Sequence, residues 1–149
     1  TVWNDRAQRY LLNAISNKQF DLWCVQEHHL GEQATKYLSG KLRKKNYKVH
    51  AIPAKQVHNP EYPDILNNTG GLIIIASSQT YVERDRANTI DDFAHAVFIR
   101  FKKQTVCIIN LYLLSNRPDL ALMTMHRVKR FVTTLEVPHF LIGDRMSSK

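Results

Sequence analysis

Three oxygen-bearing side chains follow apolar stretches that have the composition of strands. Asn4 comes after "TVW", Glu27 closes "DLWCVQE", and Asp144 ends "PHFLIGD". The carboxyl end of a buried strand is a usual place for a reacting group in layered α/β proteins. Two carboxylates and an amide oxygen form a partial shell for Mg²⁺, a hard ion that keeps several waters and takes phosphate as a further ligand. Strand ends are usually polar, so the spacing alone favours residues that only begin a loop.

The seven histidines add little to this set. His28 and His29 are adjacent, so in extended chain they face opposite ways and only one of them can join Glu27. His50 and His95 fall inside strand-like stretches, where packing or exposure is expected rather than catalysis. The remaining three have no HxxxH or HxxE partner: His58, His126 and His139.

Hydrophobic periodicity predicts the elements that must position these residues. Apolar residues recur at helical spacing over about 5–18, 32–45 and 118–136. The second helix is expected to bury Tyr37, Leu38 and Leu42, and the third to bury Met125 and Val128. The polar stretch 54–69 is expected to be the least regular part of the chain. Strands are predicted at 22–26, 47–53, 71–76, 94–101, 105–111 and 139–142.

This order of elements predicts an α/β fold with a mixed sheet. The strands at 22–26, 72–76, 106–111 and 140–142 are expected to share one sheet of about six strands, with helices on one face. The last two of these strands should be parallel, because a helix joins them. In the strand at 94–101, Ala96 and Phe98 should face one side and Val97 and Ile99 the other.

Composition limits the class of protein. The 149 residues, 44% hydrophobic and 23% charged, suit one domain over 1–149. No apolar run approaches the ~20 residues that a bilayer-spanning helix needs. The first residues lack the layout of a secretory signal, and the chain starts without methionine, so the N-terminus is expected to be processed or incomplete and the compartment stays undetermined. Cys24 and Cys107 could form a structural disulfide, but reduced thiols in the core are the expected state.

The charge of the chain favours an anionic partner. The net charge is +8 and the isoelectric point is about 9.7, which suits nucleic acid, phosphate head groups or an acidic protein surface. Five of the 21 basic residues lie in "KLRKKNYK", at 41–48. Such a run is more often a solvated helix end than a docking site.

Taken in order, the motifs resemble those of a known superfamily. Asn4 after an apolar stub, then "DLWCVQEHHL", "TGGLIIIA", "CIINLYLLSN" and "PHFLIGD", are similar to the signatures of the endonuclease/exonuclease/phosphatase superfamily. It has the DNase I-like fold and includes apurinic/apyrimidinic endonucleases and the endonuclease domains of LINE-type retrotransposons. The resemblance spans nearly the whole chain.

The resemblance implies roles for five residues. Glu27 would bind the divalent metal, expected to be Mg²⁺, and Asn4 would help at the metal–phosphate site. Tyr112 would contact the phosphate region with Asn110 supporting it, and Asp144 would help to activate the attacking water. Gly70 and Gly71, the glycine pair of the motif, would be backbone requirements rather than reactive groups.

The sequence also departs from the family pattern. Met146 stands where the family has a second asparagine, Arg145 replaces an apolar residue, and Leu114 replaces a proline. The family domain continues to an Asp-His pair that has no counterpart in this sequence. The expectation is therefore the N-terminal part of the sandwich, with the sheet face opposite the helices open and covered by other protein chains.

Two classes of function follow from the resemblance. One is a degenerate domain without catalysis that acts as a binding or structural subunit of a larger assembly. The other is a Mg²⁺-dependent phosphodiesterase of the retrotransposon endonuclease type, whose C-terminal half lies outside this sequence. The "GDRM" ending favours the first class. Asn4, Glu27, Tyr112 and Asp144 favour the second.

Overall fold

A computed structural model of the chain describes residues 22–59, 61–83 and 88–145, with residues 144 and 145 described by their backbone alone. The helix expected at about 5–18 and Asn4 before it lie outside this part of the chain. The described residues form two helices, α2 (Glu32–Lys44) and α3 (Pro118–Thr133). Their strands are β1 (Leu22–Gln26), β2 (Lys48–Ile52), β3 (Lys55–His58), β4 (Leu66–Thr69), β5 (Leu72–Ala76), β6 (Tyr81–Val82), β7 (Asn88–Asp91), β8 (Ala94–Phe101), β9 (Gln104–Leu113) and β10 (His139–Arg145).

The strands form two main sheets instead of the single sheet predicted. One sheet has the order β1-β5-β2, and the other has the order β10-β9-β8-β6 with β7 also paired to β8. The prediction of one sheet is wrong because β5 pairs with β1 and β2 along its two edges, while β8 and β10 occupy both edges of β9. Neither central strand, β5 or β9, therefore has an edge left to pair with the other sheet. The prediction that β9 and β10 are parallel is confirmed.

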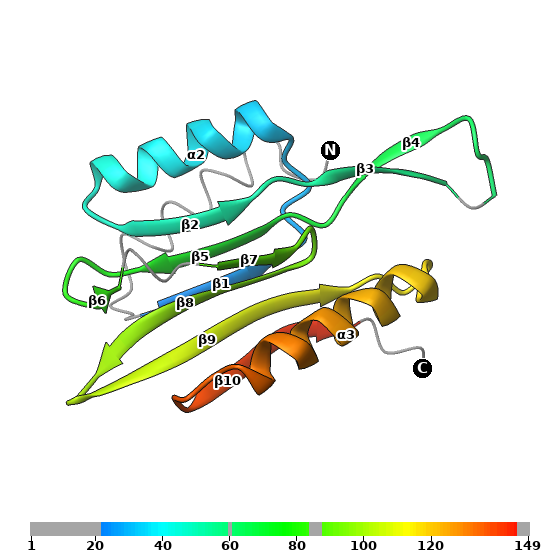
Figure 1. The fold of residues 1–149 in the computed structure, drawn as a ribbon. Helices are drawn as coiled ribbons and strands as arrows, with labels where there is room; N and C mark the ends of the chain where they lie inside the picture. The colour runs from blue at the N-terminus through cyan, green and yellow to red at the C-terminus, as the bar shows by residue number, and fades with distance from the viewer. Residues whose placement is uncertain (1–21, 60, 84–87, 146–149) are drawn as a thin grey trace.

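The two sheets pack face to face, with one helix on each outer face (Figure 1). Side chains from both sheets fill the space between them, including Ile74 of β5, Val97 of β8 and Ile108 of β9. Helix α2 covers the three-stranded sheet through Leu38 and Leu42. The expectation of an open sheet face is therefore wrong for β5, β8 and β9, whose inner faces are covered by the other sheet, whereas the side chains of β10 are exposed on both faces.

Strand β8 shows the alternation that the sequence predicts. Ala96 and Phe98 pack with Val128 of α3, whereas Val97 and Ile99 face the other sheet. Apolar side chains thus point to both faces of this strand, which explains why its sequence is apolar over most of its length.

The set of residues that each helix buries differs slightly from the predicted set. Tyr37 is 60% exposed and Met125 is 40% exposed, so both predictions of burial are wrong. Threonines occupy the inward positions instead. The Thr35 hydroxyl donates to the Gly31 carbonyl at 2.7 Å, and the Thr124 hydroxyl donates to the Asp91 carboxylate at 2.8 Å. These hydrogen bonds allow a polar residue to be buried where the sequence pattern favours an apolar one.

The stretch predicted to be irregular contains a hairpin. Strands β3 and β4 pair antiparallel from Lys55↔Thr69 to His58↔Leu66. Their side chains are mostly exposed on both faces, so the sequence has no apolar alternation from which to predict them. The short strands β6 and β7 were not predicted either.

The cysteines agree with the expectation of reduced core thiols. Cys24 and Cys107 are both free, and Cys107 is buried. Burial raises the pKa of the Cys24 thiol to about 12. Because the thiolate is the reactive form, Cys24 is expected to be inert at neutral pH.

Candidate functional site

Three strand ends meet at one edge of the sandwich. Cys24 packs in the same cluster as Ile108, and Gln26 Nε2 donates to Asn110 Oδ1 at 2.5 Å, so β1 runs along β9 in the same direction. In the parallel pair of β9 and β10, Asp144 lies in register with Tyr112. Glu27, Tyr112 and Asp144 therefore lie at the same edge, and the sequence predicts this for Glu27 and Asp144, which follow strands. Asn4 lies outside the described residues.

The Glu27 carboxylate can be reached from solvent at this edge. Its side chain is 28% exposed, and its Oε1 lies 3.8 Å from Nε2 of His29. Glu27 and His29 both have positive φ, at 59° and 57°, so the backbone turns sharply as it leaves β1. The expectation that only one of the adjacent histidines can join Glu27 holds, since His28 is fully buried.

A metal site at this edge would depend on residues from more than one strand. Among residues 22–59, 61–83 and 88–143, whose side chains the structure describes, no three His, Cys, Asp or Glu side chains are grouped closely enough to hold a metal ion. Glu27 offers one accessible carboxylate, and the backbone of Asp144 places a second carboxylate residue at the same edge. Such a pair suits a hard divalent ion. The metal-ligand roles of Glu27 and Asn4, and the water-activating role of Asp144, remain predictions.

The glycine pair holds the chain that follows Glu27. The amide N of His28 donates to the Gly71 carbonyl at 3.3 Å, and the amide N of His29 donates to the Gly70 carbonyl at 3.0 Å. Both glycines have positive φ, at 78° and 91°. A Cβ on Gly71 would lie 2.3 Å from the His28 ring, closer than atoms can approach. The pair is therefore a backbone requirement, as predicted.

The His28 ring is fixed by two backbone groups. The amide N of Leu30 donates to Nδ1 at 2.9 Å, so Nδ1 must be unprotonated. Nε2 then carries the proton and donates to the Ile52 carbonyl at 2.9 Å. Burial lowers the pKa of His28 to about 4. The ring is therefore neutral near pH 7 and acts as a structural link between the β1 end and β2.

Asn110 belongs to a chain of hydrogen-bonded polar side chains between the sheets, here called the polar chain, which runs from Gln26 through Asn110 and His95 to His50. The side chain of Asn110 is fully buried. Its Nδ2 faces the carbonyls of Val25 at 3.2 Å and Ile73 at 3.4 Å, which can only accept hydrogen bonds. This identifies Nδ2 as the amide nitrogen, and the same atom lies 3.0 Å from Nε2 of His95. Asn110 thus links β9 to β1, β5 and β8 at once.

The polar chain determines which nitrogens of two histidines carry protons. Nδ2 of Asn110 can only donate, so Nε2 of His95 accepts and the His95 proton is on Nδ1. His95 Nδ1 lies 2.8 Å from Nδ1 of His50 and donates to it. His50 therefore carries its proton on Nε2. Burial lowers the pKa of His95 well below its ordinary value and also lowers that of His50.

Tyr112 is a core residue over most of its side chain. It is 4% exposed and packs with Leu72, Phe93 and Leu114. Leu114, which replaces the proline of the family pattern, contributes to the same cluster and is 3% exposed. The predicted contact of Tyr112 with a phosphate remains a prediction, and the packing leaves little of its surface for a ligand.

Sequence reasoning missed most members of the polar chain. Gln26, His50 and His95 were given no role, although all three join the sheets through Asn110. The one available signal is a histidine between two alanines in an apolar strand, as in "FAHAVFI". A buried histidine requires partners, but the sequence alone does not say which.

The two packed sheets with helices on their outer faces define the fold as the DNase I-like fold of the endonuclease/exonuclease/phosphatase superfamily. The chain is similar to the human Nocturnin catalytic domain with bound sulfate anion (TM-score 0.63, 14% identity, 95% of this chain and 57% of that one). It is also similar to ANGEL2, a 2′,3′-cyclic phosphatase (TM-score 0.62, 16% identity, 91% of this chain and 42% of that one). A third similar structure is TDP2 from Caenorhabditis elegans (TM-score 0.56, 15% identity, 95% of this chain and 43% of that one).

The chain spans about half the length of these solved structures. At such identities the likeness shows the fold alone. No protein-family model and no curated protein sequence matches the chain. No helix in the described part of the chain is long and apolar enough to cross a membrane.

Proposed function

We propose that this chain is a degenerate domain of the endonuclease/exonuclease/phosphatase fold that does not cleave phosphate esters and acts as a binding or structural subunit. The supporting observation is the use of Asn110 and Tyr112 for packing. Asn110 is fully buried with its amide bonded inside the sandwich, and Tyr112 is 4% exposed. Neither leaves much polar surface with which to contact a substrate.

The residues after Asp144 also support the absence of catalysis. By the resemblance, Met146 replaces an asparagine that would hydrogen-bond the phosphate, and a thioether is at best a weak acceptor. Catalysis needs interactions that strengthen as charge develops in the transition state. Loss of one oriented donor typically lowers a rate about 10²–10³-fold.

The second candidate is a Mg²⁺-dependent phosphodiesterase of which this chain is one part. It is favoured by the position of Glu27 and Asp144 at one edge of the sandwich. It is also compatible with the coverage of the similar structures, since the chain spans 57%, 42% and 43% of their lengths. Glu27, Asp144 and Asn4 would hold the ion, which would neutralise phosphate charge and polarise the ester. ANGEL2 is a 2′,3′-cyclic phosphatase, which suggests a 2′,3′-cyclic phosphate as one substrate to test beside DNA, RNA and phosphoinositide.

A cleavage assay separates the two candidates. With Mg²⁺ present, the chain is expected to hydrolyse DNA, RNA, a 2′,3′-cyclic phosphate end and a phosphoinositide no faster than its Glu27→Ala variant. Product formation should be followed by gel and by phosphate release. Mg²⁺-dependent turnover that Glu27→Ala abolishes supports the second candidate instead. A binding assay cannot decide, because the basic chain is expected to bind nucleic acid non-specifically and more weakly as salt rises.

We also propose that another protein chain binds along β10. This strand pairs only with β9 among the described strands, and its apolar side chains are exposed on both faces. Phe140 is 55%, Leu141 52% and Ile142 39% exposed. An edge strand with unpaired backbone groups and apolar side chains favours strand addition by a partner.

The β10 proposal predicts association that one substitution weakens. Without a natural partner, the chain should self-associate as concentration rises, and Phe140→Lys should shift it towards the monomer in sedimentation velocity. Tyr62→Lys is the matched control, because Tyr62 is equally exposed, at 59%, but lies in the loop between β3 and β4. A chain that stays monomeric at high concentration contradicts the proposal.

A further inference from the structure

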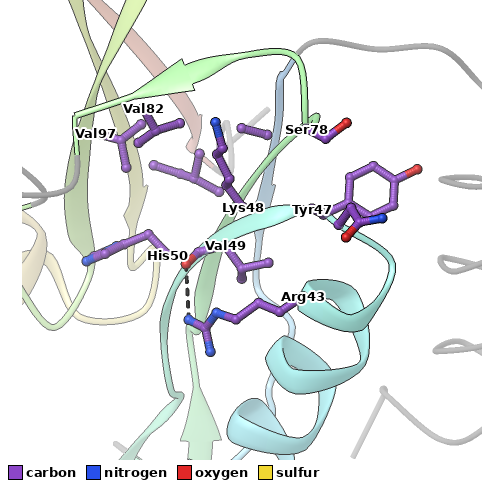
Figure 2. Close-up of a pocket in the computed structure, with 11 residues that line it drawn as sticks. Arg43, Tyr47, Lys48, Val49, His50, Ser78, Val82 and Val97 are labelled. Atoms are coloured by element: carbon purple, nitrogen blue, oxygen red, sulfur yellow. Dashed lines mark hydrogen bonds between the residues drawn. The ribbon is translucent and has the colours of Figure 1, made fainter.

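A pocket of about 750 Å³ opens between the sheets, at the opposite end of the strands from Glu27. Its position follows from register, since Lys48 and Leu22 both pair with Ala76, whereas Gln26 pairs with Leu72 at the Glu27 end. The pocket lies beside β2, β5, β6 and β8 and the C-terminal end of α2 (Figure 2). Its size falls in the range of sites for small organic ligands, about 300–1,000 Å³.

The pocket has apolar walls and a cationic rim. The apolar side chains come from both sheets: Ile74, Val82 and Val97. Arg43 and Lys48 lie at the rim, and the lining residues of the described chain include no carboxylate. Arg43 Nη2 donates to the Val49 carbonyl at 3.2 Å, and Lys48 Nζ donates to the Thr80 carbonyl at 2.5 Å. Both cations keep further N–H groups, because an ammonium has three and a guanidinium has five.

His50 adds a donor of known position in the ring. The polar chain from Asn110 through His95 places the His50 proton on Nε2. Among the described residues, no buried side-chain nitrogen or oxygen lacks a hydrogen-bond partner, and none of the hydrogen bonds of His50 involves Nε2. Nε2 must therefore be accessible, and His50 is a lining residue of the pocket. The ring can donate there while it remains neutral.

We propose that this pocket is a binding site for an amphipathic acid, meaning a carboxylate carried on an apolar chain. The apolar part would lie against Ile74, Val82 and Val97, and the carboxylate would accept hydrogen bonds from His50 Nε2 and the Lys48 ammonium. Apolar walls from two sheets exclude a purely polar ligand, and the cations without a carboxylate disfavour an amine. The site is separate from the Glu27 edge and does not depend on the proposed function.

The test compares ligands that differ only in one part. Dodecanoate, below its micellar concentration, is expected to bind in calorimetry. Dodecyltrimethylammonium, which has an apolar chain only one carbon longer and the opposite charge, should bind at least about tenfold more weakly, and acetate should show no measurable binding. Equal binding of the cationic compound, or binding of acetate as tight as that of dodecanoate, overturns the proposal.

Variants locate the site. Lys48→Met keeps the apolar stem and should weaken dodecanoate binding about tenfold, because a charge-assisted hydrogen bond is lost. Lys102→Met, at the exposed turn between β8 and β9, is the matched control and should leave binding unchanged. An equal loss in both variants overturns the assignment to this pocket.

Two further measurements keep the test independent of folding. Ser78→Trp, on the exposed rim, should block the pocket without disturbing the core, and circular dichroism checks that the variant folds. In imidazole nitrogen NMR, dodecanoate should shift the His50 Nε2 resonance and leave the exposed His126 unchanged. Unchanged His50 resonances at saturating dodecanoate overturn the proposal.

Discussion

Replacing Gly71 by alanine is expected to lower the free energy of unfolding by about 3 kcal/mol. Gly71 has a φ of 91°, a conformation that costs an L-residue about 1–3 kcal/mol. The new methyl group would also lie 2.3 Å from the His28 ring, so the ring must move. This movement would weaken the hydrogen bonds of the ring to the Leu30 amide and the Ile52 carbonyl. Each such hydrogen bond contributes about 1 kcal/mol.

Gly40→Ala is the matched control for this change. Gly40 lies inside α2, and a Cβ there would meet no atom within 4 Å. The same substitution should therefore stabilise the chain, by up to about 1 kcal/mol, because alanine has the higher helix propensity. Urea denaturation of both variants tests the pair. Equal effects would mean that the conformation of Gly71 and its contact with His28 are unimportant.

A double-mutant cycle separates the two causes at Gly71. In a His28→Ala background the ring is absent, so Gly71→Ala should cost only the conformational part. The difference between the two backgrounds measures the contact with the ring. If Gly71→Ala costs the same in both, the steric explanation is wrong and the positive φ accounts for the whole effect.

The elements were predictable where each strand or helix carries its own pattern. β8 alternates between Ala96 and Phe98 on one face and Val97 and Ile99 on the other, and both faces pack as predicted. Helix α3 begins at Pro118, which has a fixed φ suited to the first turn. These features are local, so one stretch of sequence contains the information.

The division into two sheets was not predictable from such patterns. β5 is buried along its whole length, and β9 over most of its length, so neither strand has a polar face that identifies its neighbours. An apolar run is equally compatible with either sheet, and pairing depends on strands far away in the sequence. The order of motifs suggested the superfamily, but the number of sheets followed only from the pairing.

In the candidate site too, contacts between residues far apart in the sequence were not predictable. Glu27 and Asp144 were predicted at one edge, together with Asn4, because each follows an apolar stretch that is visible in the sequence. The chain of Gln26, Asn110, His95 and His50 was not, because its hydrogen bonds join residues 84, 15 and 45 positions apart. A polar residue inside an apolar strand indicates that a partner exists and leaves its identity open.

The buried histidines lead to the second large prediction, a loss of stability in mild acid. Burial lowers the pKa of His28 from 6.5 to about 4, and that of His95 well below 6.5. As the pH falls below 6.5, the unfolded chain takes up protons at these positions and the folded chain does not. The free energy of unfolding should therefore decrease from about pH 6.5 towards pH 4 and be insensitive to these two groups above pH 6.5.

The geometry explains why the folded chain resists protonation. Nδ1 of His28 accepts from the Leu30 amide, and Nε2 of His95 accepts from Asn110, so a proton on either atom would break a buried hydrogen bond. The charges that His50 and His28 would carry would both repel a cation at His95. His28 alone should lower the stability by on the order of 2 kcal/mol at about pH 5, and His95 adds to this loss.

Urea denaturation at about pH 7 and pH 5, with EDTA present to exclude bound metal ions, measures this loss. His95→Gln should reduce the difference between the two pH values, because a glutamine can accept from Asn110 and donate to His50 but does not titrate. His126→Gln is the matched control, since His126 is exposed on α3 and should leave the difference unchanged. Stability that is the same at both pH values would mean that the two rings accept protons in the folded chain. The polar chain between the sheets could not then have the arrangement of protons inferred from its hydrogen bonds.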